Sequence, residues 1–123
     1  MTMYAKISIN PINSLLFISD IGGGVPPKPV RGPMILSTSS CISFRCYPEQ
    51  DGPTEVTLGR IDEVDPGRVP AFEGELETPS RTVIVSTVNL ETVLRTAVQN
   101  AQTKVKIWLS HPQWPEKVIV GVG

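Results

Sequence analysis

The chain has 123 residues, a length that fits one domain and is too short for two ordinary ones. Hydrophobic residues make up 40% and charged residues 19%, so the chain can bury a core and lacks the composition of a disordered protein. The formal net charge of −1 argues against a nucleic-acid partner, because proteins that bind nucleic acid carry a basic surface.

The first third of the chain predicts two strands and one long loop. The opening residues lack the apolar stretch of a signal peptide, and no apolar run is long enough to span a membrane. The alternation in residues 4–9 predicts a strand, and residues 15–19 predict a second, largely buried one. Residues 20–33 hold three consecutive glycines and four prolines, which predict a loop. Residues 25–30 within it either cover a sheet edge or dock into an aromatic groove of a partner.

The middle of the chain predicts further short strands. Residues 34–37 predict an edge strand, and residues 41–47 and 54–60 predict two longer strands. The Asp51-Gly52 pair between the longer strands predicts that they form a hairpin. Residues 61–70 predict a loop.

Residues 71–77 alternate and predict a strand with Phe72 and Leu76 on one face. Residues 82–86 predict a buried strand. Residues 88–100 have two interpretations: an amphipathic helix, or a strand over 91–98 that forms a hairpin with residues 104–109.

The end of the chain predicts two more strands. Residues 103–110 point Lys104 and Lys106 outward, residues 111–115 predict a loop, and residues 117–122 predict the last strand. The sequence therefore predicts an all-β fold. We expect an antiparallel β-sandwich of roughly eight to ten short strands, with at most one short helix, in a single domain over residues 1–123.

No residue pattern predicts catalysis, a cofactor or a metal site. The single histidine, His111, precedes a proline in a predicted loop, with no nucleophile or carboxylate placed near it. Cys41 and Cys46 do not combine with it into a zinc pattern. Because their spacing points the two cysteines to opposite faces of a strand, we expect free thiols and a cytoplasmic protein.

Acidic residues and tryptophans are the candidate contact residues. Residues 61–77 carry six carboxylates against the single Arg68, and a strand places three of them on one face, roughly 7 Å apart. Such a row is either a solvated face that discourages aggregation or a surface for a basic protein partner. Trp108 faces away from Val105 and Ile107, and is therefore covered by another element or part of a binding surface. The predicted partner-binding residues are Glu73, Glu75, Glu77, Asp62, Asp65, Trp108 and Trp114.

The order of elements resembles a known family. The segment Ile7-Ser-Ile-Asn-Pro-Ile-Asn-Ser-Leu-Leu-Phe-Ile-Ser-Asp20, the proline-rich loop and Cys41-Ile-Ser-Phe44 are similar to the opening of the competence protein J family. Residues 94–110 are similar to its closing hairpin. The resemblance implies a small β-sandwich that binds and inhibits a DNA-entry nuclease, with no catalytic residues to carry over, and it favours a strand over residues 91–98.

Three function classes follow from the sequence. The first is a non-catalytic protein-binding module, such as an inhibitor or immunity-type partner of a nuclease or toxin. The second is a structural or accessory domain of a phage or secretion operon, and the third is a small-ligand-binding protein or enzyme. The acidic row favours the first, with a basic protein as partner and neither nucleic acid nor membrane involved.

Overall fold

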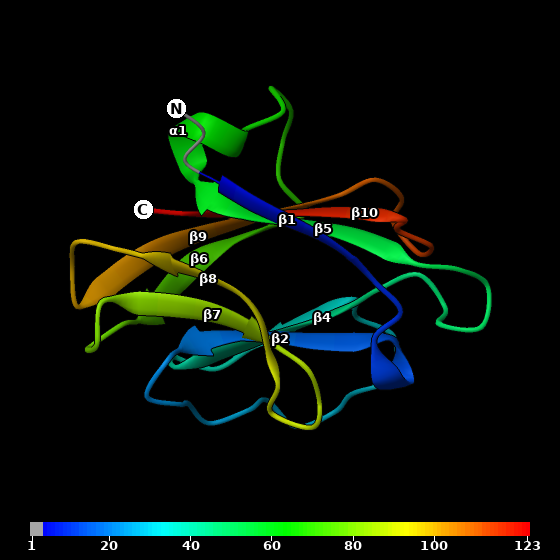
Figure 1. Cartoon of the computed structure of the whole chain (residues 1–123), viewed down its shortest axis with the longest axis horizontal. Coiled ribbons are helices and arrows are strands. Elements are labelled where there is room, and N and C mark those ends of the chain that lie inside the picture. Colours follow the sequence, from blue (N-terminus) through cyan, green and yellow to red (C-terminus); the bar gives the residue numbers. More distant parts are fainter. Residues whose placement is uncertain (1–3) are drawn as a thin grey trace.

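Two five-stranded sheets face each other in a computed structural model that describes residues 4–123 (Figure 1). Residues 1–3, which belong to the opening in which no signal peptide is predicted, lie outside the described residues. Sheet A contains, in spatial order, β1 (Tyr4–Ile9), β5 (Thr54–Arg60), β10 (Lys117–Val122), β9 (Gln102–Leu109) and β6 (Phe72–Glu77). Sheet B contains β3 (Ile35–Ser37), β4 (Cys41–Arg45), β2 (Leu15–Asp20), β7 (Thr82–Ser86) and β8 (Thr92–Ala97). The predicted β-sandwich is confirmed.

Alternating side chains from both sheets build one core. On β5, Val56 and Leu58 point inward and are fully buried, and Ile18 and Phe44 meet them from sheet B. Such alternation is what a strand with one buried face requires. The pairs are antiparallel except for β5 and β10, which run parallel at the centre of sheet A. The sheets are therefore mostly, rather than wholly, antiparallel.

Both predicted hairpins are wrong, although the strands themselves are confirmed. β4 pairs on its two edges with β2 and β3, which leaves no edge for β5, so the chain crosses from sheet B to sheet A at residues 46–53. Likewise β8 pairs with β7 in sheet B, and the chain then crosses to β9 in sheet A. The observed hairpins are β3–β4, β7–β8 and β9–β10.

Two short helical turns complete the described chain: the 3-10 turn η1 (Ile12–Ser14) and α1 (Ile61–Val64). Residues 61–70, predicted as a loop, thus begin with one turn of helix, which packs on β5 and β10. Residues 88–100 contain the strand β8, as the family resemblance favours. Within residues 4–123, no helix has the length and apolar character needed to cross a membrane.

Candidate functional site

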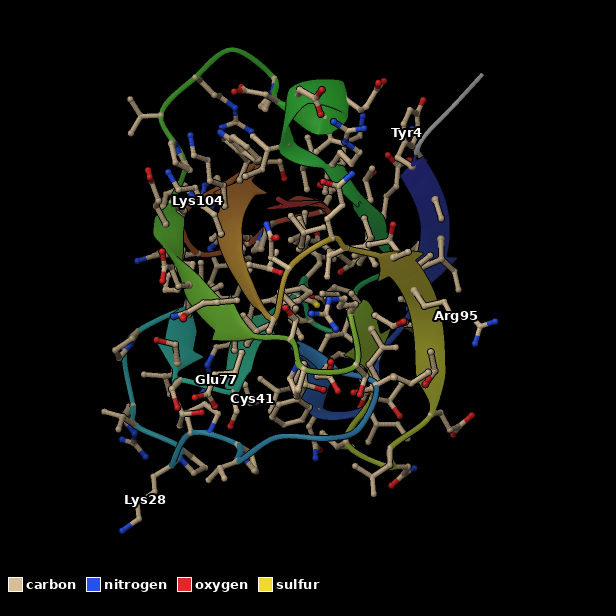
Figure 2. The ribbon with its side chains drawn as sticks, turned by 90° about the vertical axis from the view of Figure 1, so that its left-hand side faces the viewer. Tyr4, Lys28, Cys41, Glu77, Arg95 and Lys104 are labelled. Carbon is tan, nitrogen blue, oxygen red and sulfur yellow. The ribbon has the colours of Figure 1, made fainter. Side chains whose placement is uncertain are left out.

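The three predicted glutamates lie in a row on the outward face of β6, one of the two edge strands of sheet A. The strand register places Glu73 opposite Lys106, Glu75 opposite Lys104, and Glu77 opposite Gln102 on β9. All three glutamates are exposed, and β6 runs along one side of the molecule, where Figure 2 labels Glu77 and Lys104. We call Glu73, Glu75 and Glu77 the acidic row.

Neighbouring side chains partly neutralise the acidic row. Lys104 Nζ lies 3.6 Å from Glu73 Oε2, and Gln102 Nε2 donates a 2.8 Å hydrogen bond to Glu75 Oε2. Among residues 4–123, the Glu77 carboxylate has a single hydrogen-bond contact, a long one of 3.5 Å from Ser39 Oγ. Because two lysines stand against three glutamates, the surplus negative charge is greatest at the Glu77 end, where an amide replaces a lysine.

Asp62 and Asp65 lie in the segment that crosses the outer face of sheet A and leads into β6. Asp62 Oδ1 is 3.4 Å from Arg60 Nε, and Asp65 Oδ1 accepts a 2.7 Å hydrogen bond from the Gly67 amide. The first contact lies at the start of α1, and the second shapes the turn after it. Within residues 4–123, no three His, Cys, Asp or Glu side chains are arranged to hold a metal ion.

Trp108 is covered and adds no exposed contact area. Its side chain faces outward from β9, as the alternation predicts, but it is only 1% exposed. Its Nε1 donates a 2.8 Å hydrogen bond to the Arg68 carbonyl, and an Arg68 guanidinium nitrogen donates to the Leu109 carbonyl at 3.1 Å. The segment after α1 thus covers the indole. Trp108 is therefore not part of the proposed contact surface.

Trp114 is 55% exposed, but lies apart from the acidic row. It belongs to the loop after the end of β9, whereas Glu77 pairs near the beginning of β9. His111 organises this loop, because its Nδ1 accepts hydrogen bonds from the Gln113 and Trp114 amides at 3.1 and 3.0 Å. The tip of the loop borders an open hollow of about 790 Å³, lined in part by Tyr47. The predicted contact residues therefore do not form one patch.

Both cysteines are free, as predicted from their spacing, and both are buried. Burial raises the pKa of the Cys41 thiol to about 11. Burial also raises the pKa of Cys46 to about 12, although a hydrogen bond with Thr54 opposes the shift. Because the thiolate is the reactive form, both thiols are held in an unreactive state near neutral pH.

The outer face of sheet B is a surface that sequence reasoning missed. The loop after β2 and the turn between β7 and β8 lie beneath this sheet in Figure 1, and an apolar groove of about 530 Å³ separates them. Phe17 and Ile84 line its floor. The sequence of β2 could have predicted this surface, because residues 15–18 are apolar on both faces of the strand.

Comparison with known proteins identifies similar folds. No protein-family model and no curated protein sequence matches the chain. The chain is similar to the crystal structure of ComJ, an inhibitor of the DNA-degrading activity of NucA from Bacillus subtilis. The TM-score is 0.66 and the identity 8%, over 97% of this chain and 92% of that one. The resemblance to the competence protein J family is thereby confirmed as a likeness of fold.

A second solved structure, crocagin biosynthetic gene J, is more distant. Its TM-score is 0.48 at 10% identity, over 98% of this chain and 94% of that one.

Proposed function

We propose that this chain is a non-catalytic protein-binding module of the cytoplasm that inhibits a nuclease or another toxin-type enzyme by binding to it. The observation that supports the proposal is the fold shared with an inhibitor of a DNA-degrading enzyme over nearly the whole length of both chains. An inhibitor of this kind needs a rigid, complementary surface rather than catalytic groups.

The proposed contact surface is the acidic row, with its Glu77 end as the centre. The row stands on a strand whose backbone is fixed by pairing with β9, so its carboxylates meet a row of Lys or Arg without first ordering a loop. A basic partner would displace Lys104 from Glu73, and the 3.6 Å separation of this exposed pair makes that exchange easy. Complementary charge chiefly speeds association and selects the partner.

The test of the proposed function is an inhibition assay. The probes are the nucleases encoded in the genome of the organism from which this chain comes, each purified and supplied with plasmid DNA. We expect DNA degradation to stop at a one-to-one ratio of the two proteins, and gel filtration to show a complex of that composition. Undiminished degradation at a large excess of the chain, with no complex formed, would refute the proposal.

Neutralising the acidic row should weaken capture of this partner without unfolding the chain. In the variant Glu73→Gln/Glu75→Gln/Glu77→Gln, we expect association at low salt to slow about tenfold and its salt dependence to flatten. The melting temperature should shift by no more than about 3 °C, because exposed ion pairs contribute little to stability. Stopped-flow binding and thermal unfolding measure the two effects.

A matched control separates the position of the charges from their number. The variant Glu49→Gln/Glu55→Gln/Glu116→Gln changes the net charge equally, but the three residues lie away from β6. Glu55 is also paired with a lysine, as Glu73 is, because Glu55 Oε1 lies 3.7 Å from Lys6 Nζ. Equal slowing by both variants would show that only the overall charge matters, and the acidic row would then lose its role.

A further inference from the structure

The outer face of sheet B carries an apolar groove between two loops. Alternation on β2 and β7 turns Phe17 and Ile84 outward, away from the core that their neighbours fill. The groove of about 530 Å³ lies between the glycine segment 22–24 and the β7–β8 turn. A second apolar hollow, of about 250 Å³, adjoins it beneath the prolines of the loop and shares Phe17 and Pro26 with it.

One wall of the groove is fixed by contacts with the β3–β4 turn. Gly24 presses so closely on the Ser40 carbonyl that a side chain at this position would collide with it. The Val25 amide donates a 2.8 Å hydrogen bond to Ser40 Oγ, and Thr38 Oγ1 donates one of 2.6 Å to the Val25 carbonyl. The groove is therefore formed before any partner arrives, which lowers the entropy lost on binding.

The other wall presents Leu90, which is 86% exposed. Its backbone φ of +65° lies in the left-handed region, where glycine or asparagine is favoured over leucine. Hydrogen bonds within the turn stabilise this conformation, because Thr87 Oγ1 accepts hydrogen bonds from the Asn89 and Glu91 amides at 3.2 and 3.3 Å. A strained backbone that holds an exposed leucine in a fixed place contributes nothing to this chain's own core, and is typical of a binding anchor.

Unpaired positive charge flanks the groove on two sides. Arg45 lines the adjoining hollow, and Lys28 and Arg31 stand in the loop whose prolines also line it. On the other side, Arg95 of β8 lies opposite Ile84 in the strand register. The acidic residue on the two flanking loops is Glu91, and the ion pairs among residues 4–123 involve none of the four cations. Figure 2 shows Lys28 and Arg95 pointing away from the body of the protein. The surface therefore suits a partner of opposite charge to the one expected at the acidic row.

We propose that the outer face of sheet B is a second protein-docking surface, whose occupant is an extended acidic segment that inserts a large apolar side chain into the groove. Leu90 packs against that side chain, and the carboxylates of the segment meet the cations around the groove. The apolar contact supplies the affinity and the charges supply the orientation.

The experiment selects the occupant directly from peptides of random sequence displayed on phage. With the full chain immobilised, we expect the enriched peptides to share acidic residues around one aromatic or large aliphatic residue. Fluorescence anisotropy of a selected peptide then measures its dissociation constant for the chain and its variants. Enrichment of basic peptides, or of none, overturns the proposal.

Leu90→Asn is the decisive variant, because it removes the anchor and relieves the strained backbone together. We expect the dissociation constant to rise about tenfold or more while the melting temperature rises by about 2–4 °C. Loss of affinity in a more stable protein excludes misfolding as the cause. The control is Val69→Asn, which removes an equally exposed aliphatic side chain, 88% exposed, from the outer side of sheet A.

Two further outcomes would overturn the proposal. The first is equal affinity of the Leu90→Asn and Val69→Asn variants for the selected peptide. The second is self-association of the chain in sedimentation velocity that Leu90→Asn abolishes, because the occupant would then be a second copy of this chain. Neither outcome depends on inhibition of a nuclease. A result that refutes this second docking surface therefore leaves the proposed inhibitory function untouched, and the reverse also holds.

Discussion

Replacing Trp108 with alanine should destabilise the protein by about 3–5 kcal/mol, the range for removing a fully buried large aromatic side chain. Trp108 is among the largest fully buried side chains, although it lies on the outer face of its sheet. The indole packs beside Gly121 together with Ile61 of α1, where even a single added methyl group would be crowded. Its loss leaves a cavity and removes the surface on which α1 and the following segment rest.

Urea unfolding followed by circular dichroism measures this effect, and Trp114→Ala is the matched control. Trp114 is 55% exposed, so its replacement should change the free energy of unfolding by no more than about 1 kcal/mol. The control also leaves Trp108 as the one tryptophan, whose fluorescence should be that of a buried indole. Similar losses in both variants would contradict the covered position of Trp108.

Trp108→Phe separates packing from hydrogen bonding. It keeps most of the apolar surface but leaves the Arg68 carbonyl without the indole N–H that now lies 2.8 Å away. We expect a loss of about 1–2 kcal/mol, between the effects of the two alanine variants.

Strand positions could be predicted from the sequence because they depend on local alternation. Residues 4–9 and 54–60 alternate apolar and polar side chains, and each forms a strand with the expected bounds. Strand pairing could not be predicted in the same way. The Asp51-Gly52 pair indicates that the chain turns, but not whether it returns beside the same strand or crosses to the other sheet. That choice depends on which strand edges are already occupied by partners distant in sequence, as β2 and β3 occupy those of β4.

In the candidate site too, features set by local alternation could be predicted, whereas those set by strand pairing could not. That Glu73, Glu75 and Glu77 share one face follows from period-two spacing, and the structure agrees. That lysines stand opposite two of them follows only from the β6–β9 register, which joins residues about thirty positions apart. The outward direction of Trp108 was likewise predictable. The segment that covers its indole, which follows α1 and includes Arg68, was not predictable, because it has no hydrophobic periodicity.

Replacing Asp20 should also lower the free energy of unfolding strongly, because its buried carboxylate anchors the base of the long loop. The residue is 1% exposed, and its two oxygens accept hydrogen bonds from the Ser80 amide at 2.9 Å and the Gly22 amide at 2.8 Å. Asp20→Ala leaves both amides without this acceptor. Because hydrogen bonds to a charged group are among the stronger ones, we expect a loss of about 2–4 kcal/mol at neutral pH.

Asp20→Asn should cost less, about 1.5–3 kcal/mol, because the asparagine carbonyl can replace one carboxylate oxygen while its NH2 group meets the other amide donor. The control is Asp51→Asn on the exposed connection between β4 and β5, with an expected change within about 0.5 kcal/mol. Equal stability of the Asp20 and Asp51 variants would contradict the anchoring role.

The pH dependence of the free energy of unfolding separates the contribution of the Asp20 charge from that of the side chain's shape. Burial by itself raises the pKa of this carboxyl, but hydrogen bonds from Ser80 and Gly22 outweigh it, so the pKa in the folded state lies below the usual 3.8. A carboxyl whose pKa is lowered by folding adds stability above its unfolded pKa and loses that contribution as pH falls through the folded value. The difference in unfolding free energy between the wild type and Asp20→Asn should therefore be constant above about pH 5 and shrink below about pH 4. Urea titrations from neutral pH down to the acid limit of folding measure it, and a difference that stays constant down to that limit would show that the carboxylate charge contributes nothing.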